Sequence, residues 1–139
     1  MINVLDTIID QTAERFGIIV PQEKVENEAT GMRMELQSRM QYRRLTSGNP
    51  YVDHEALQQE LNAIELEAYR QVKTQLVLER VVKEEDLSVT QQELEEEAQA
   101  IATRQNMSLD MVKDFLGESL EPIRKDLLLR KAEEWILTN

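Results

Sequence analysis

The sequence predicts an all-α protein built from several helices in one domain. Apolar residues recur every three or four positions along most of the chain, and residues of high helix propensity are abundant. Only four glycines and three prolines occur among 139 residues, and most of them fall where one apolar stripe ends and the next begins. No segment requires a β-strand.

The first two helices are expected at residues 3–16 and 21–45. Gly17 is well placed to end the first helix, and the β-branched run at 18–20 before Pro21 favours a short extended connector. Pro21 suits the first turn of the second helix. The apolar stripes consist of Leu5, Ile8, Ile9, Ala13 and Phe16 in the first helix and Val25, Ala29, Met32, Leu36 and Met40 in the second.

A third, long helix is expected at residues 54–85. The SGNP break at 47–50 precedes it, and Asp53 is suited to be its N-cap. Between residues 76 and 82 the apolar residues occupy nearly all sides, so this segment is expected at the centre of the core. We expect the second and third helices to pair as one antiparallel arm. The stripe of the third helix consists of Leu57, Leu61, Ile64, Ala68, Val72 and Leu76.

A fourth helix is expected at residues 91–105. Thr90 and Glu93 have the spacing of a capping box, in which each side chain bonds the free backbone N–H of the other residue. The carboxylates at 95–97 have no basic partner in this stretch and step round the helix by about 100° each, so they diverge. We therefore favour a capped, solvated helix face over a carboxylate site.

Two further helices are expected at residues 109–117 and 120–137. Gly117 ends the short helix, and we expect the helices between residues 90 and 117 to form a second arm. Ser119 is expected to cap the last helix, with Pro122 in its first turn. Asp126 and Arg130 are spaced for an ion pair on that helix.

Charge and composition exclude several classes of function. Sixteen basic against 27 acidic residues give a net charge of −11, which opposes binding to nucleic acid or to an anionic membrane. The chain has no cysteine, so disulfides and thiolate metal sites are excluded. No N-terminal signal and no apolar run of about 20 residues is found, so a cytoplasmic location is expected.

Catalytic constellations are also missing. His54 is the single histidine and lies between Asp53 and Glu55, where a surface imidazole is a simpler interpretation than a base or a metal ligand. No glycine-rich phosphate loop, H-E-x-x-H pair or nucleophile elbow occurs, and one histidine cannot supply the two Glu-x-x-His motifs of a di-metal bundle. The sequence therefore predicts no enzyme, no metal and no cofactor.

Three segments carry a resemblance to a known family. They are the connector IIVP at residues 18–21, the VKTQLVLERVVKEE segment at 72–85 with the LSVT that follows it, and DLLLRKAEEWI at 126–136. In this order and spacing they resemble the C-terminal chaperone domain of bacterial trigger factor over nearly the whole chain. A related helical domain occurs in SurA-type periplasmic foldases.

The resemblance implies a multi-helix chaperone domain with long antiparallel helical arms around a small core. It further implies an ATP-independent holdase that binds unfolded or nascent polypeptides on apolar surfaces between the arms. The ribosome-binding and prolyl isomerase domains of trigger factor do not fit in these residues, so the chain is expected to be an excised domain or a stand-alone relative. Ribosome contact is then expected only through domains absent here. The oligomeric state stays open, with a dimer among the alternatives.

A holdase needs adaptable apolar contact area, and methionine provides it because its unbranched thioether repacks at little cost. Met32 and Met34 are two positions apart, so they cannot both enter one core.

A different hypothesis is a helical oligomerisation or adaptor module, in which the third helix serves one fixed protein partner. The candidate client-binding residues are Met34, Met40, Tyr42, Leu45 and Tyr51 near the tip of the first arm, and Met107, Met111 and Phe115 on the second.

Overall fold

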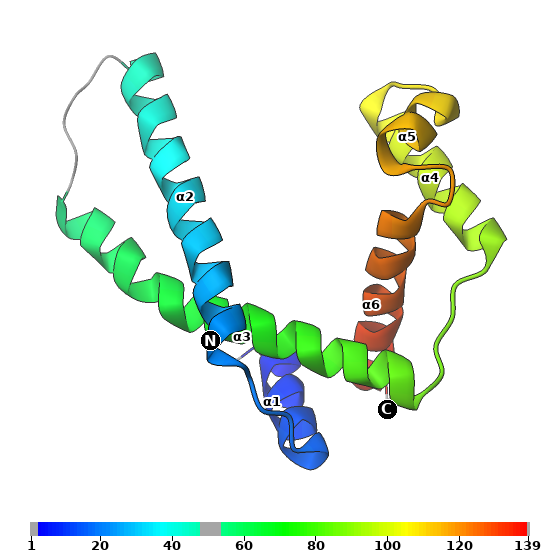
Figure 1. Ribbon diagram of the computed structural model, residues 1–139, viewed down its shortest axis with the longest axis horizontal. Coiled ribbons are helices and arrows are strands. Elements are labelled where there is room, and N and C mark those ends of the chain that lie inside the picture. The colour runs from blue at the N-terminus through cyan, green and yellow to red at the C-terminus, as the bar shows by residue number, and fades with distance from the viewer. Residues whose placement is uncertain (1–2, 48–53, 139) are drawn as a thin grey trace. The chain divides into compact units, whose positions relative to one another are not determined.

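The computed structural model describes residues 3–47 and 54–138, and every regular element in these ranges is an α-helix (Figure 1). The predicted all-α fold is confirmed, and each predicted helix end lies within two residues of the observed one. In the described part of the chain, no helix has both the length and the apolar character needed to cross a membrane. The helices are α1 (Val4–Phe16), α2 (Gln22–Ser47), α3 (His54–Glu84), α4 (Gln91–Gln105), α5 (Leu109–Leu116) and α6 (Glu121–Thr138).

Local signals in the sequence set most of the helix ends. Gly17 adopts a left-handed conformation with φ of 64° and donates its N–H to the carbonyl oxygen of Glu14 at the end of α1. At the start of α4, the Thr90 hydroxyl accepts from the Glu93 N–H and the Glu93 carboxylate accepts from the Thr90 N–H, both at 3.1 Å. The predicted capping box is therefore confirmed. Asp53, the expected N-cap of α3, lies outside the described residues.

The start of α6 differs from the prediction. Leu120, and not Ser119, immediately precedes the helix, and the Leu120 carbonyl accepts from the N–H groups of Ile123 and Arg124. Leu120 has φ of 54°, a left-handed conformation that costs a non-glycine residue free energy. Its side chain is fully buried in the core, so burial of a large apolar group offsets this strain. Tertiary packing, which the sequence pattern did not reveal, overrides the capping signal of Ser119.

The chain divides into two compact units, Met1–Val77 and Leu78–Asn139. In unit 1, α2 and Val20 of the connector before it pack with α3 around one apolar cluster. Two ion pairs join α1 to α3, Asp6 to Arg70 at 3.5 Å and Asp10 to Lys73 at 2.8 Å. The cluster confirms that the second and third helices pair. Its buried members are Val25, Ala29, Leu36, Ile64, Ala68 and Val72.

In unit 2, α4, α5 and α6 pack together with the connector that leads into α4. The end of α3 belongs to this unit, and Val81 there is fully buried. Val77, Leu78 and Val81 are buried, whereas Glu79 and Arg80 between them are exposed. That this segment is the centre of the core stays a prediction. The buried members of the unit 2 cluster are Val89, Leu94, Ala98, Ala102, Val112, Leu120 and Ile123.

Candidate functional site

Three of the predicted client-binding residues form an exposed apolar surface on α2. Met34, Tyr42 and Leu45 are exposed by 64%, 69% and 86%. At about 100° per residue they fall within roughly 80° of helix circumference, so they share one face. We call this face the α2 stripe. A helix with apolar residues on its solvent side offers contact area that its own fold does not use.

The opposite face of α2 forms the interior of unit 1. Leu36 is buried there, and Met32 packs against the same cluster while Met34 points away from it. The prediction that Met32 and Met34 lie on opposite sides of α2 is confirmed. Met40 is half-buried and also packs against this cluster, so it shares the face of Met32. Tyr51, the remaining candidate near the arm tip, lies outside the described residues.

The short helix α5 carries a second exposed apolar surface. Met111 and Phe115 are one turn apart and are exposed by 48% and 79%; we call them the α5 patch. Leu109 and Leu116 on the other side of α5 pack against the core cluster of unit 2, and Val112 between the two sides is buried. The Ser108 hydroxyl accepts from the Met111 N–H at 3.2 Å and fixes the first turn of the helix. Met107 is half-buried and packs against the core cluster of the unit.

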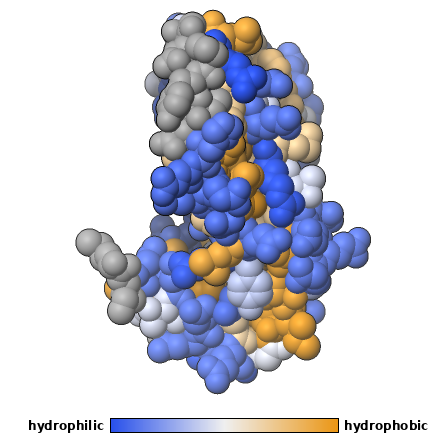
Figure 2. Space-filling model, turned by 90° about the vertical axis from the view of Figure 1, so that its left-hand side faces the viewer, coloured by the Kyte–Doolittle hydropathy of each residue, from blue (hydrophilic) through white to orange (hydrophobic). Residues whose placement is uncertain are grey.

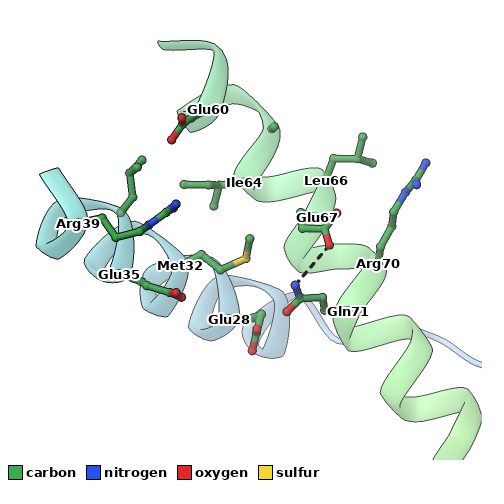
Figure 3. Close-up of a pocket in the computed structure, with 12 residues that line it drawn as sticks. Glu28, Met32, Glu35, Arg39, Glu60, Ile64, Leu66, Glu67, Arg70 and Gln71 are labelled. Carbon is green, nitrogen blue, oxygen red and sulfur yellow. Dashed lines mark hydrogen bonds between the residues drawn. The ribbon is translucent and has the colours of Figure 1, made fainter. Parts of the chain in front are cut away.

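A groove of about 530 Å³ lies between α2 and α3 within unit 1 (Figure 3). Its apolar lining comes from Met32 and Leu36 on α2 and from Ala63 and Ile64 on α3. Figure 3 shows Met32 directed toward α3, with Ile64 facing it from the other helix. A groove with an apolar floor can accept side chains of another polypeptide.

Charged residues surround the apolar floor of this groove. Four carboxylates and two guanidinium groups line the groove, so its net charge is −2. Arg70 also pairs with Asp6 of α1, and Gln71 donates to the Glu67 carboxylate at 3.3 Å. The charged lining residues are Glu28, Glu35, Glu60, Glu67, Arg39 and Arg70.

The apolar periodicity of α2 and α3 does not reveal this groove. Leu66 lines it and is 60% exposed, although it lies outside the apolar stripe of α3. An apolar residue off the buried stripe is the signal that could have indicated it. The spacing of charges along α2 and α3 does not itself reveal a groove, because it depends on how the two helices pack.

The acidic cluster at the start of α4 is not simply solvated, which corrects the sequence interpretation. Glu95 lies 3.5 Å from Lys113 of α5, and Glu97 is half-buried and lies 3.4 Å from Arg130 of α6. The carboxylates do diverge as expected. Their basic partners come from elsewhere in unit 2, so the local sequence could not show them.

The Glu93 carboxylate accepts hydrogen bonds both from Lys131 of α6 and from the backbone N–H of Thr90. The hydrogen bond from Lys131 lowers the pKa of Glu93, and the backbone N–H of Thr90 lowers it further. Lys131 also donates to the Ser88 carbonyl at 2.8 Å, and Arg124 donates to the adjacent Val89 carbonyl at 3.2 Å. The ion pairs between the acids of α4 and the basic side chains of α5 and α6 therefore join the helices of unit 2. Among the described residues, no three acids or histidines are arranged to hold a metal ion.

Apolar surface remains visible among hydrophilic side chains on the face viewed in Figure 2. The fold and these surfaces define an all-α protein made of packed helical hairpins with exposed apolar side chains on each unit. Residues 2–138 match the family model described as the C-terminus of bacterial trigger factor protein. The chain therefore belongs to the trigger factor C-terminal family, a chaperone family, as the sequence resemblance predicted.

Individual relatives agree with this assignment. The trigger factor of Anoxybacillus flavithermus (strain DSM 21510 / WK1) is 32% identical over 138 residues, which cover 96% of this chain and 31% of the relative. The trigger factor of Geobacillus sp. (strain WCH70) is 28% identical with the same coverage. This chain thus spans about a third of the length of these relatives.

A solved structure of trigger factor domains from Thermotoga maritima has the same fold. It superposes with a TM-score of 0.61 at 23% identity, covering 99% of this chain and 84% of that chain. The likeness extends over the whole chain, so all six helices take part in the shared fold.

Proposed function

We propose that this chain is an ATP-independent holdase that binds unfolded or nascent polypeptides on the α2 stripe and the α5 patch. The observation that carries the proposal is the two-sided character of both helices. On α2, Leu36 is buried whereas Met34 on the other side is exposed. On α5, Leu109 and Leu116 pack against the core cluster of unit 2, whereas Met111 and Phe115 on the other side are exposed. Such apolar side chains have no use in the packing of their own unit, and they offer contact area to another chain.

The chemistry of these surfaces suits varied clients. Methionine and tyrosine adapt to partners of different shape, because the thioether is flexible and the phenol has both an apolar ring and a polar end. The net charge of −11 keeps a chain with exposed apolar side chains in solution. Membership in a chaperone family supports the proposal, and we place its action in the cytoplasm.

Aggregation of several unrelated denatured proteins tests this function. The chain should suppress light scattering by most of them without nucleotide, at molar ratios near one. A lysozyme of similar mass serves as the inert control protein. Suppression for one client alone, or a single tight complex with one protein, would instead support the adaptor hypothesis, because a fixed partner requires one complementary surface.

A further inference from the structure

We propose that Met34 and Met111 are oxidation sites through which a hydroperoxide reversibly weakens polypeptide binding. The inference rests on the proposed function, because it assigns a means of regulation to the same two surfaces. It follows from the sulfur content of the chain, the exposure of each thioether and the positions of these two residues on α2 and α5.

The sulfur chemistry of this chain belongs to methionine alone. The sequence has six methionines and no cysteine. Thiolates normally react first with mild two-electron oxidants, and here none competes. An oxidant that reaches the chain therefore acts on thioether sulfur before other side chains.

The described methionines fall into two groups by exposure. Met34 and Met111 are exposed by 64% and 48%. Met32, Met40 and Met107 are half-buried and pack against the apolar clusters of their units. Because the oxidant must approach the sulfur atom, the two exposed thioethers should react first.

Both exposed thioethers lie on the surfaces proposed to bind polypeptides. Met111 is one turn from Phe115 in the α5 patch, and Met34 begins the α2 stripe. Leu109 and Leu116 on the other side of α5 pack against the core cluster, so a change at Met111 leaves the interior of unit 2 packed. Oxidation at these two positions should therefore alter binding more than folding.

The reaction converts an apolar contact into a polar one. The sulfur lone pair attacks a peroxide oxygen, an S–O bond forms and the O–O bond breaks. Sulfur loses two electrons, the proton on the attacked oxygen moves to the leaving oxygen, and hydrogen peroxide is thereby reduced to water. The sulfoxide oxygen is a strong hydrogen-bond acceptor, and its burial against an apolar client side chain is unfavourable. A methionine sulfoxide reductase with a dithiol reverses the step, forming a disulfide and water.

The first measurement is the order of oxidation. The 139-residue chain is treated with limiting hydrogen peroxide, and peptide mapping by mass spectrometry follows each methionine. Met34 and Met111 should be oxidised several times faster than Met32, Met40 and Met107. Met1 lies outside the described residues and is followed by its own peptide. Equal rates at all five internal positions would overturn the proposal.

The second measurement is the change in binding on oxidation. Fluorescence anisotropy reports binding of labelled, reduced and carboxymethylated α-lactalbumin before and after peroxide treatment. The parent should bind about fivefold more weakly after oxidation, since loss of a real apolar contact has about this effect. Reduction by a sulfoxide reductase should restore the original affinity.

Two double variants give the matched comparison. Met34→Leu with Met111→Leu removes the reactive sulfurs and keeps apolar side chains, so its affinity should no longer respond to peroxide. Met32→Leu with Met107→Leu should still respond like the parent. A peroxide response in the first variant equal to the parent's would overturn the oxidation sites while leaving the proposed function in place. Absence of binding by the untreated parent would overturn both.

Discussion

The Lys131 ammonium of α6 lies 2.7 Å from the Glu93 carboxylate of α4. The same ammonium donates to the Ser88 carbonyl in the connector before α4. Glu93 also completes the capping box with Thr90. A single lysine thus fixes the start of one helix, the connector before it and the packing of α6 on both.

Replacement of Lys131 should destabilise the fold. In Lys131→Met the long apolar stem is kept, but the Ser88 carbonyl and the Glu93 carboxylate both lose the hydrogen bond from the lysine. The urea midpoint of unfolding, followed by circular dichroism, should fall. Lys125→Met, an exposed position on the same helix, is the matched control and should have little effect. Equal midpoints for the two variants would show that the Lys131 contacts contribute nothing measurable.

The lowered pKa of Glu93 makes part of the stability depend on pH. The ordinary value is 4.5, and the hydrogen bond from Lys131 lowers the pKa below it in the folded chain. A carboxyl group with a depressed folded pKa contributes stability above its unfolded pKa and loses it as pH falls through the folded pKa. The stability difference between the parent and Glu93→Gln should therefore shrink below about pH 4.5.

Urea unfolding at a series of pH values between 7 and 3 measures this difference. Glu96→Gln is the control, since the Glu96 carboxylate accepts an intrahelical hydrogen bond from Gln92 at the exposed surface. A Glu93→Gln difference that is independent of pH would contradict the role assigned to Lys131.

Gly31 is a site where substitution should stabilise the chain. It lies in the middle of α2, and an added Cβ would meet no atom within 4 Å. Gly31→Ala should raise the free energy of unfolding by about 0.5–1 kcal/mol, because alanine loses less backbone entropy on helix formation. Gly17→Ala should lower it, because φ of 64° is strained for alanine. Thermal melts of the two variants check the opposite signs.

The proposed binding surfaces predict a separation of binding from stability. Changing Met34, Tyr42, Met111 and Phe115 together to Ser should greatly weaken suppression of aggregation, since each real contact contributes roughly 1 kcal/mol or more. Thermal stability should change little, because all four side chains are exposed. Leu94→Ala should instead cost about 2–5 kcal/mol of stability, because Leu94 is fully buried. Melting of the quadruple variant as low as Leu94→Ala would show that the four residues stabilise the fold.

We also expect no prolyl isomerase activity from this chain. Isomerisation of a proline-containing peptide, followed with a chromogenic substrate, should proceed at the uncatalysed rate. The reason is that the chain belongs to the C-terminal family of trigger factor. A rate increase that survives repurification and scales with protein concentration would contradict this expectation.

Short-range features of this chain were predictable, and contacts distant in sequence were not. The capping box needs two residues three positions apart, and the Asp126–Arg130 ion pair needs two residues four apart, so the sequence shows both. Lys131 and Glu93 are 38 positions apart, and their pairing depends on how α6 packs. The local sequence of α4 therefore indicates solvated acids, because it does not contain their basic partners.

Among the candidate binding residues, too, features within one helix were predictable and contacts between helices were not. Periodicity distinguishes the two faces of α2, so Met34 was correctly placed opposite Met32. Residue type alone favours Met40 and Met107 as binding residues, but each packs against a core cluster. The groove between α2 and α3 depends on the side chains of two helices at once, which one-dimensional periodicity does not encode.

Leu120 has a consequence for how much variation the start of α6 can tolerate. Its backbone conformation favours glycine or asparagine, while its fully buried side chain requires a large apolar group. Glycine would relieve the backbone and leave a cavity, and valine or isoleucine would fill the space but worsen the strain. In a saturation library at this position selected for folded protein, leucine and methionine should therefore be retained and nearly every other residue lost. This is expected although the residue lies between two helices, where variation is usually tolerated.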